Sequence, residues 1–158
     1  VPFSTKGSFM QVTFYELIAT SLEKTLPRIL EKVYESGLKA IVRTENEERL
    51  KTIDSAMWTY TTMGFLPHGT SKDPLEFLPH QPIWITTGDD NPISATVLVV
   101  TTQVYATDSN YERLLDLYDG NDQQNIQNAM ERMEKYRQDG HEVIWWKQSI
   151  KGSWEKEK

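Results

Sequence analysis

The sequence predicts a single α/β domain of Rossmann-like type, with a mostly parallel central sheet and helices on both faces. Apolar patterns typical of strands alternate along the chain with apolar stripes at helical spacing. Residues that favour helix ends stand between these patterns. A continuous β-branched run at residues 95–102 suits a central strand covered on both faces.

The first half of the chain predicts two strands and two helices. Residues 11–17 alternate apolar and polar and predict the first strand, and residues 39–44 predict the second. The helix between them should end at Gly37, and its Pro27 belongs near the start, which makes Thr25 the expected N-cap. Asn46 should cap the next helix. The apolar positions of that helix are Leu50, Ile53, Met57 and Trp58.

The second half predicts further strands and one long helix. Residues 59–81 are rich in Gly and Pro and predict a loop, after which residues 82–87 and 95–102 predict strands. The segment 111–118 fits either a strand or a short helix, and we favour a strand. Asp122 and Gly140 bound the last helix, before a strand at residues 142–148 and a charged tail. The positions of this helix expected to face inward are Ile126, Ala129, Met130 and Met133.

Composition limits the classes of function. The 158 residues suit one domain, predicted over residues 10–158, and residues 1–9 are expected to be a remnant of cloning. A net charge of −6 argues against direct nucleic-acid binding, because phosphate contacts need basic residues. The absence of cysteine excludes disulfides and fits a cytoplasmic protein. No apolar run reaches the ~20 residues that span a membrane, so no membrane association is expected.

The motifs of nucleotide and metal chemistry are missing from the sequence. Neither a P-loop nor a dinucleotide-binding glycine pattern occurs, and residues 16–20 after the first strand contain no glycine to wrap a phosphate. The spacing of His68, His80 and His141 fits no common ligand pattern. We therefore expect no cofactor, no metal and no catalytic residue. A small nucleotide-dependent enzyme of Rossmann type is the alternative.

Two groups of side chains could serve in binding. Trp58 and Phe65 are either core residues or an exposed apolar patch of the kind that marks protein interfaces. The last helix carries cations beside an aromatic residue, which is either a solvated face or a site for an acidic peptide. These residues of the last helix are Arg132, Lys135, Tyr136 and Arg137.

Nine segments in this order resemble the chi subunit family of DNA polymerase III. The resemblance runs from Met10 to Lys158. The segments are QVTFYEL, LPRILEKVYESGLKAIV, ERLKTIDSAMW with FLPHG, HQPIWIT, ATVLVV, RLLDLYDG, MEKYRQDGHEV and the closing WEKEK.

The resemblance implies a non-catalytic subunit of the clamp-loader complex that works in DNA replication. Chi pairs with the psi subunit, and it binds the acidic, Phe-ended C-terminal tail of single-stranded DNA-binding protein. The psi-facing surface, which a helicase partner also uses, includes a Trp and a Phe that match Trp58 and Phe65. Because psi is less widespread than chi, the clamp-loader partner here is either psi or a replacement.

The resemblance is weaker at the tail-binding site. Where the family has basic residues and a Tyr, this chain has Met130, Met133 and Glu134. Tyr118 matches an apolar pocket position. Either the site has shifted along the helix or tail binding is weak. For a shifted site we favour Arg132 and Lys135 as the cationic pair with Tyr136 beside them, since these three share a helix face by spacing; Arg137 lies on another.

Overall fold

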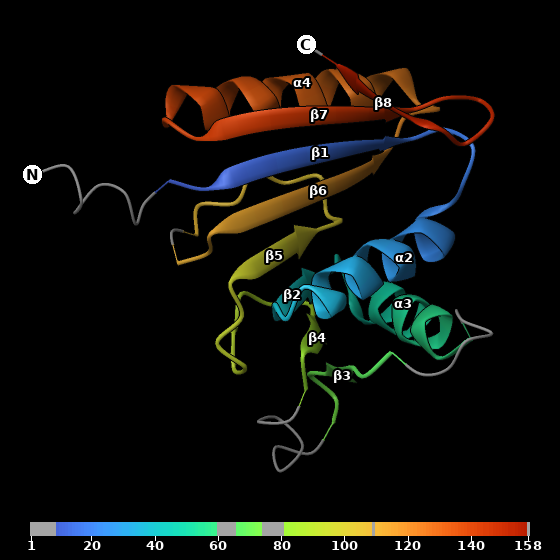
Figure 1. Ribbon diagram of the computed structural model, residues 1–158, viewed down its shortest axis with the longest axis vertical. Coiled ribbons are helices and arrows are strands. Elements are labelled where there is room, and N and C mark those ends of the chain that lie inside the picture. Colours follow the sequence, from blue (N-terminus) through green and yellow to red (C-terminus); the bar gives the residue numbers. More distant parts are fainter. Residues whose placement is uncertain (1–8, 60–65, 74–80, 109, 158) are drawn as a thin grey trace, which may run out of the picture. The chain divides into compact units, whose positions relative to one another are not determined.

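The protein has a mixed α/β fold, seen in a computed structural model (Figure 1). The structure describes residues 9–59, 66–73, 81–108 and 110–157. These residues form three helices and eight strands. The strand pairings described below are parallel, except that the C-terminal strand β8 is antiparallel to β7. The prediction of an α/β fold with mostly parallel strands is therefore confirmed, whereas helices on both faces stay a prediction.

The chain divides into two compact units, residues 1–22 with 103–158 and residues 23–102. The first unit is a sheet in the order β6-β1-β7-β8, and helix α4 packs against β6, β1 and β7 (Figure 1). β1 is parallel to β6 and β7, and β8 is antiparallel to β7. The elements are β1 (Gln11–Leu17), β6 (Arg113–Asp119), α4 (Gln123–Gln138), β7 (Glu142–Gln148) and β8 (Trp154–Glu157).

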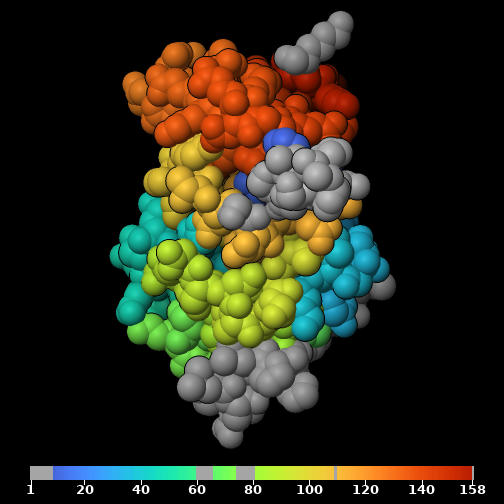
Figure 2. Space-filling view, turned by 90° about the vertical axis from the view of Figure 1, so that its left-hand side faces the viewer, coloured from blue at the N-terminus to red at the C-terminus, as the bar shows by residue number. Residues whose placement is uncertain are grey.

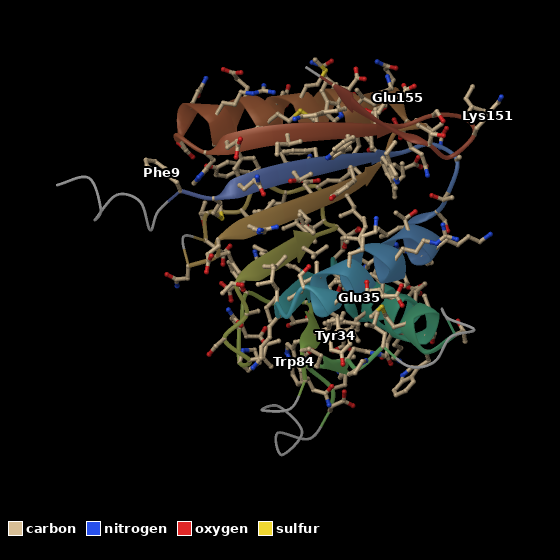
Figure 3. All side chains as sticks on the ribbon, viewed as in Figure 1. Phe9, Tyr34, Glu35, Trp84, Lys151 and Glu155 are labelled. Carbon is tan, nitrogen blue, oxygen red and sulfur yellow. The ribbon has the colours of Figure 1, made fainter. Side chains whose placement is uncertain are left out.

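The strand predicted at residues 111–118 is confirmed by β6, and the one at residues 142–148 by β7. The charged tail was not predicted to be regular, but it forms β8 after a turn that contains Lys151 (Figure 3). The turn is closed by the Ser149 N–H, which donates to the Ser153 carbonyl over 2.7 Å.

The second unit contains two helices and four parallel strands in the order β3-β4-β2-β5. All four residues of β5 are buried, as the β-branched run predicted. The elements are α2 (Leu22–Glu35), β2 (Ala40–Arg43), α3 (Glu47–Thr59), β3 (Gly69–Thr70), β4 (Ile83–Thr86) and β5 (Val97–Val100). Whether the two units make one domain stays a prediction.

Helix α2 begins earlier than predicted. It starts at Leu22, so the expected N-cap Thr25 is a buried residue inside the helix and Pro27 lies beyond the first turn. Pro27 there removes the hydrogen bond that a backbone N–H would donate to the carbonyl four residues earlier. The prediction of Thr25 as N-cap was wrong because it considered only the local cost of a proline inside a helix. Burial of Leu26 and Leu30, which are fully buried on the same helix, outweighs that cost.

The predicted caps of the other helices are confirmed. The Arg49 N–H donates to Asn46 Oδ1 over 2.8 Å at the start of α3. The Gln124 N–H donates to Asp122 Oδ1 over 2.9 Å at the start of α4, and Gly140 follows its end with a left-handed φ of 92°. Capping groups lie within a few residues of the backbone N–H and C=O groups that they serve, so the sequence alone could locate them.

The predicted inward face of α4 needs one correction. Ala129 and Met133 are buried as expected, but Met130 is 47% exposed. The buried stripe instead runs through Ala129, Arg132, Met133 and Tyr136, which is the spacing of one helix face. A cation can take the inward position because a carboxylate of β6 meets it there, as described below.

Gly37 supplies the left-handed residue after α2 and gives a direct test of this helix end. Its φ is 78°, and apart from its two chain neighbours no heavy atom of the described residues lies within 4 Å of a Cβ placed there. Gly37→Ala should therefore lower the free energy of unfolding by about 1 kcal/mol through backbone strain alone. Urea denaturation measures this change. Gly37→Asn should lose less, and an unchanged midpoint for the alanine variant would contradict the assignment.

Candidate functional site: two surfaces and a closed strand-end loop

Trp58 forms an exposed aromatic surface at the end of α3. Its side chain is 59% exposed, and its ring lies against His68 with 4.8 Å between ring centroids. The other apolar positions of the helix, Leu50, Ile53 and Met57, are buried. Phe65 lies outside the described residues, so its proximity to Trp58 stays a prediction.

The residues predicted for peptide binding near α4 divide into a buried and an exposed set. Tyr118, Arg132 and Tyr136 are buried, whereas Lys135 and Arg137 are exposed. In Figure 2, α4 belongs to the orange region at the top of the view. The interpretation that Arg132 and Lys135 form an accessible cationic pair with Tyr136 beside them needs correction, because two of these three side chains point into the protein.

Arg132 forms a buried ion pair with Asp116 on β6. Its Nε donates to Asp116 Oδ2 over 2.9 Å and its Nη2 donates to Oδ1 over 3.0 Å. The remaining Nη1 donates to the Gln103 carbonyl over 3.1 Å. Burial raises the pKa of Asp116, and the Arg132 guanidinium opposes that rise. The charge of Arg132 is thus used inside the protein, where it ties α4 to β6.

Tyr136 and Lys135 hold the segment that precedes β6. The Ala106 N–H donates to the Tyr136 hydroxyl over 2.8 Å, and the Tyr136 ring stacks on Tyr105 with 4.5 Å between centroids. Lys135 places Nζ 4.4 Å from the centroid of the Tyr105 ring, within cation–π distance. Burial raises the pKa of Tyr136 to about 12, so its hydroxyl stays protonated.

Residues 103–106 therefore present a fixed surface beside α4. Arg132 holds the Gln103 carbonyl and Tyr136 holds the Ala106 amide, while Val104 between them is 61% exposed. Gln103 has a left-handed φ of 60°, a strained value for a residue that is not glycine. Sequence reasoning missed Val104 and Tyr105, because only the fold places this segment against the helix.

Tyr118 lies on the face of the sheet that α4 covers. Its hydroxyl donates to Glu16 Oε1 over 2.7 Å, and Lys147 Nζ lies 3.7 Å from the other oxygen of this buried carboxylate. Burial, followed by the hydrogen bond to Glu16, raises the pKa of Tyr118 far above that of a free phenol. Tyr118 is therefore a neutral donor inside the unit.

The other flank of α4 combines one exposed apolar side chain with a surface ion pair. Met130 is exposed there, and Glu134 and Arg137 form a surface ion pair with 3.8 Å between Oε2 and Nη1. Such pairs contribute little to stability and stay open to exchange with a charged partner. Lys135 and Arg137 point to opposite sides of the helix, because positions two residues apart are rotated by ~200° about the helix axis.

Gln148 binds the backbone amides of the loop that follows the first strand. The backbone N–H groups of Ile18, Ala19 and Thr20 donate to Gln148 Oε1 over 3.0, 2.8 and 3.2 Å. The glycine-free loop was expected not to wrap a phosphate, yet its amides do converge on one oxygen atom. That oxygen belongs to a buried side chain of β7, so the amides are already satisfied.

The part of the chain that the structure describes holds neither a group of metal-binding side chains nor a membrane-spanning helix. Within it, no cluster of three or more His, Asp or Glu side chains is arranged to hold a metal ion. None of the described helices is long and apolar enough to cross a membrane.

Comparison with known proteins identifies one family. The model of the family described as DNA polymerase III chi subunit, HolC, matches residues 9–144. A relative described as probable DNA polymerase III subunit chi, from Rickettsia prowazekii (strain Madrid E), is 33% identical over 90 residues. The aligned region covers 57% of this chain and 53% of that protein, so the chain matches about half the length of this relative.

The buried ion pair predicts different costs for two neighbouring cations on α4. Arg132→Met leaves Asp116 buried without its partner and should lower the free energy of unfolding by about 3–5 kcal/mol. Lys135→Met removes an exposed charge and should cost less than about 1 kcal/mol. Urea denaturation of both variants measures the difference. Equal effects would show that Arg132 is not committed to Asp116, and Arg132→Met with Asp116→Leu should regain much of the loss.

Proposed function

The chain belongs to the DNA polymerase III chi subunit family, and from this premise we propose that it links the clamp loader to single-stranded DNA-binding protein. Family membership gives it an accessory role in DNA replication with a partner in the DNA polymerase III complex. The observation that carries the proposal is the family match over residues 9–144, which spans both compact units. A pull-down from the source cell tests it by asking whether clamp-loader subunits or single-stranded DNA-binding protein are recovered.

The clamp-loader partner, psi or a replacement, binds the surface around Trp58. A tryptophan that is 59% exposed leaves a large apolar area in water, and a partner recovers that area by covering it. Tryptophan is also among the residues that most often dominate binding energy at interfaces. Phe65, which the resemblance assigns to the same surface, follows α3 by six residues.

The acidic tail of single-stranded DNA-binding protein binds beside Lys135. An acidic peptide that ends in Phe needs a cation for its carboxylates and an apolar contact for its ring. Lys135 and Tyr105 lie together and Val104 is exposed in the same fixed segment. Arg132 and Tyr136 serve the site by holding that segment, and Tyr118 by supporting the sheet beneath α4. Arg137 lies on the other flank and takes no part.

The absence of catalysis is part of the same proposal. Its support is Gln148, which satisfies the three amides after β1 from within the chain. An α/β protein that used this loop for a nucleotide would need the same amides for the phosphate. The exposed surfaces around Trp58 and Lys135 are suited to binding other proteins.

Trp58→Ala should weaken binding of the purified clamp-loader partner by about 2 kcal/mol, close to thirty-fold in Kd. Isothermal titration calorimetry measures the affinity, and the melting temperature checks the fold. Tyr34→Ala is the matched control, since Tyr34 is an exposed aromatic (42%) near the end of α2 (Figure 3). Equal affinity of the Trp58 variant and the wild type would place the partner elsewhere.

Lys135→Ala should weaken binding of a synthetic acidic peptide ending in Phe by about five- to ten-fold, because a charge-assisted contact is lost. Fluorescence anisotropy with a labelled peptide measures the change. Arg137→Ala, an equal loss of charge two residues away, should leave the affinity unchanged.

Weaker binding by the Arg137 variant alone would move the peptide to the flank that carries Met130. No binding by the wild type would mean that this member of the family lacks the tail-binding function.

A further inference from the structure

We propose that His68, held by Asp54, fixes the side chain of Trp58 in its binding pose and that the partner meets it with an apolar side chain. The inference rests on the proposed function of Trp58 as the clamp-loader contact. His68 would be a positioning residue, which acts on the partner through Trp58.

The three side chains form one connected group. Asp54 and Trp58 are four residues apart on α3 and therefore share a helix face. His68 meets both: its Nε2 lies 2.7 Å from Asp54 Oδ1, and its ring lies 4.8 Å from the Trp58 ring, tilted by 57°. Exposure rises outward through the group, from the buried ring of His68 to Asp54 at 34% and Trp58 at 59%.

The backbone holds His68 in this place. Directly after His68, β3 begins at Gly69, which pairs with Trp84 of β4. A Cβ at Gly69 would lie 3.0 Å from Cζ3 of the Trp84 side chain, so a larger residue there would displace this ring. The position of His68 is thus limited by the strand that follows it and by its contacts with Leu66 and Asp54.

The polar groups beneath Trp58 are paired with one another. Nδ1 of His68 lies 3.0 Å from the Leu66 carbonyl, and Nε2 lies 2.7 Å from Asp54 Oδ1. Both ring nitrogens of His68 are therefore engaged inside the group, and its most exposed member is the Trp58 ring. An exposed aromatic ring on a hydrogen-bonded support suits contact with an apolar side chain of the partner.

Fixing Trp58 in advance favours binding. A side chain that is already ordered loses less conformational entropy when a partner covers it. His68→Gln keeps a donor for Asp54 but removes the ring behind Trp58. It should weaken binding of the purified clamp-loader partner by about five-fold, through a less ordered Trp58 rather than a lost contact.

A double-mutant cycle tests whether His68 acts through Trp58. His68→Gln should weaken binding in the wild type and add nothing when Trp58 is already alanine, because the tryptophan it positions is gone. The indole N–H signal of Trp58 in a ¹⁵N spectrum, assigned by its absence in Trp58→Phe, should shift in His68→Gln. Equal loss in both backgrounds, or an unmoved indole signal, would overturn the inference.

Two variants of Asp54 keep the test valid if His68→Gln folds poorly. Asp54→Asn can donate from its amide to a neutral Nε2 while Nδ1 still donates to Leu66, so both affinity and indole signal should stay near wild type. Asp54→Ala cannot form a hydrogen bond with His68, and it should behave like His68→Gln. Similar behaviour of the two Asp54 variants would overturn the inference. If Trp58→Ala itself binds normally, the proposed interface fails, and the indole signal still decides whether His68 holds Trp58.

Discussion

The buried ion pair between Arg132 and Asp116 is the constraint on which the first unit depends. Removing two charges from water is costly, and the cost is offset only when both are fully hydrogen-bonded. The bidentate geometry meets this condition and fixes the rotation of α4 about its own axis. That rotation turns Lys135 and Met130 outward and lets the third donor of Arg132 hold the backbone of Gln103.

The same principle governs the ends of the parallel strands in this unit. Gln148 satisfies the amides after β1, and the Tyr118 hydroxyl is bound by Glu16. These polar groups are paired with each other inside the unit. The exposed groups of this unit include a cation beside an aromatic ring, Lys135 with Tyr105, and peptide recognition is the role proposed for this pair.

Each compact unit carries one of the two proposed surfaces. Trp58 and its support belong to residues 23–102, and Lys135 with Tyr105 belongs to the other unit. In both, an accessible residue is backed by a buried one: Trp58 by His68, and Tyr105 by Tyr136. Buried support limits the motion of the exposed side chain, and a side chain that is already ordered loses less conformational entropy when a partner covers it.

The sequence by itself determined the class of fold, most strands and the caps at Gly37, Asn46 and Asp122, because these depend on patterns and contacts within a few residues. Only the tertiary structure decided which face of α4 is buried. Helical spacing indicates which residues share a face. Arg132, however, is buried because it pairs with Asp116 on β6, 16 residues earlier in the chain. The amide of Gln148 likewise reaches a loop about 130 residues earlier in the chain, which no local pattern could indicate.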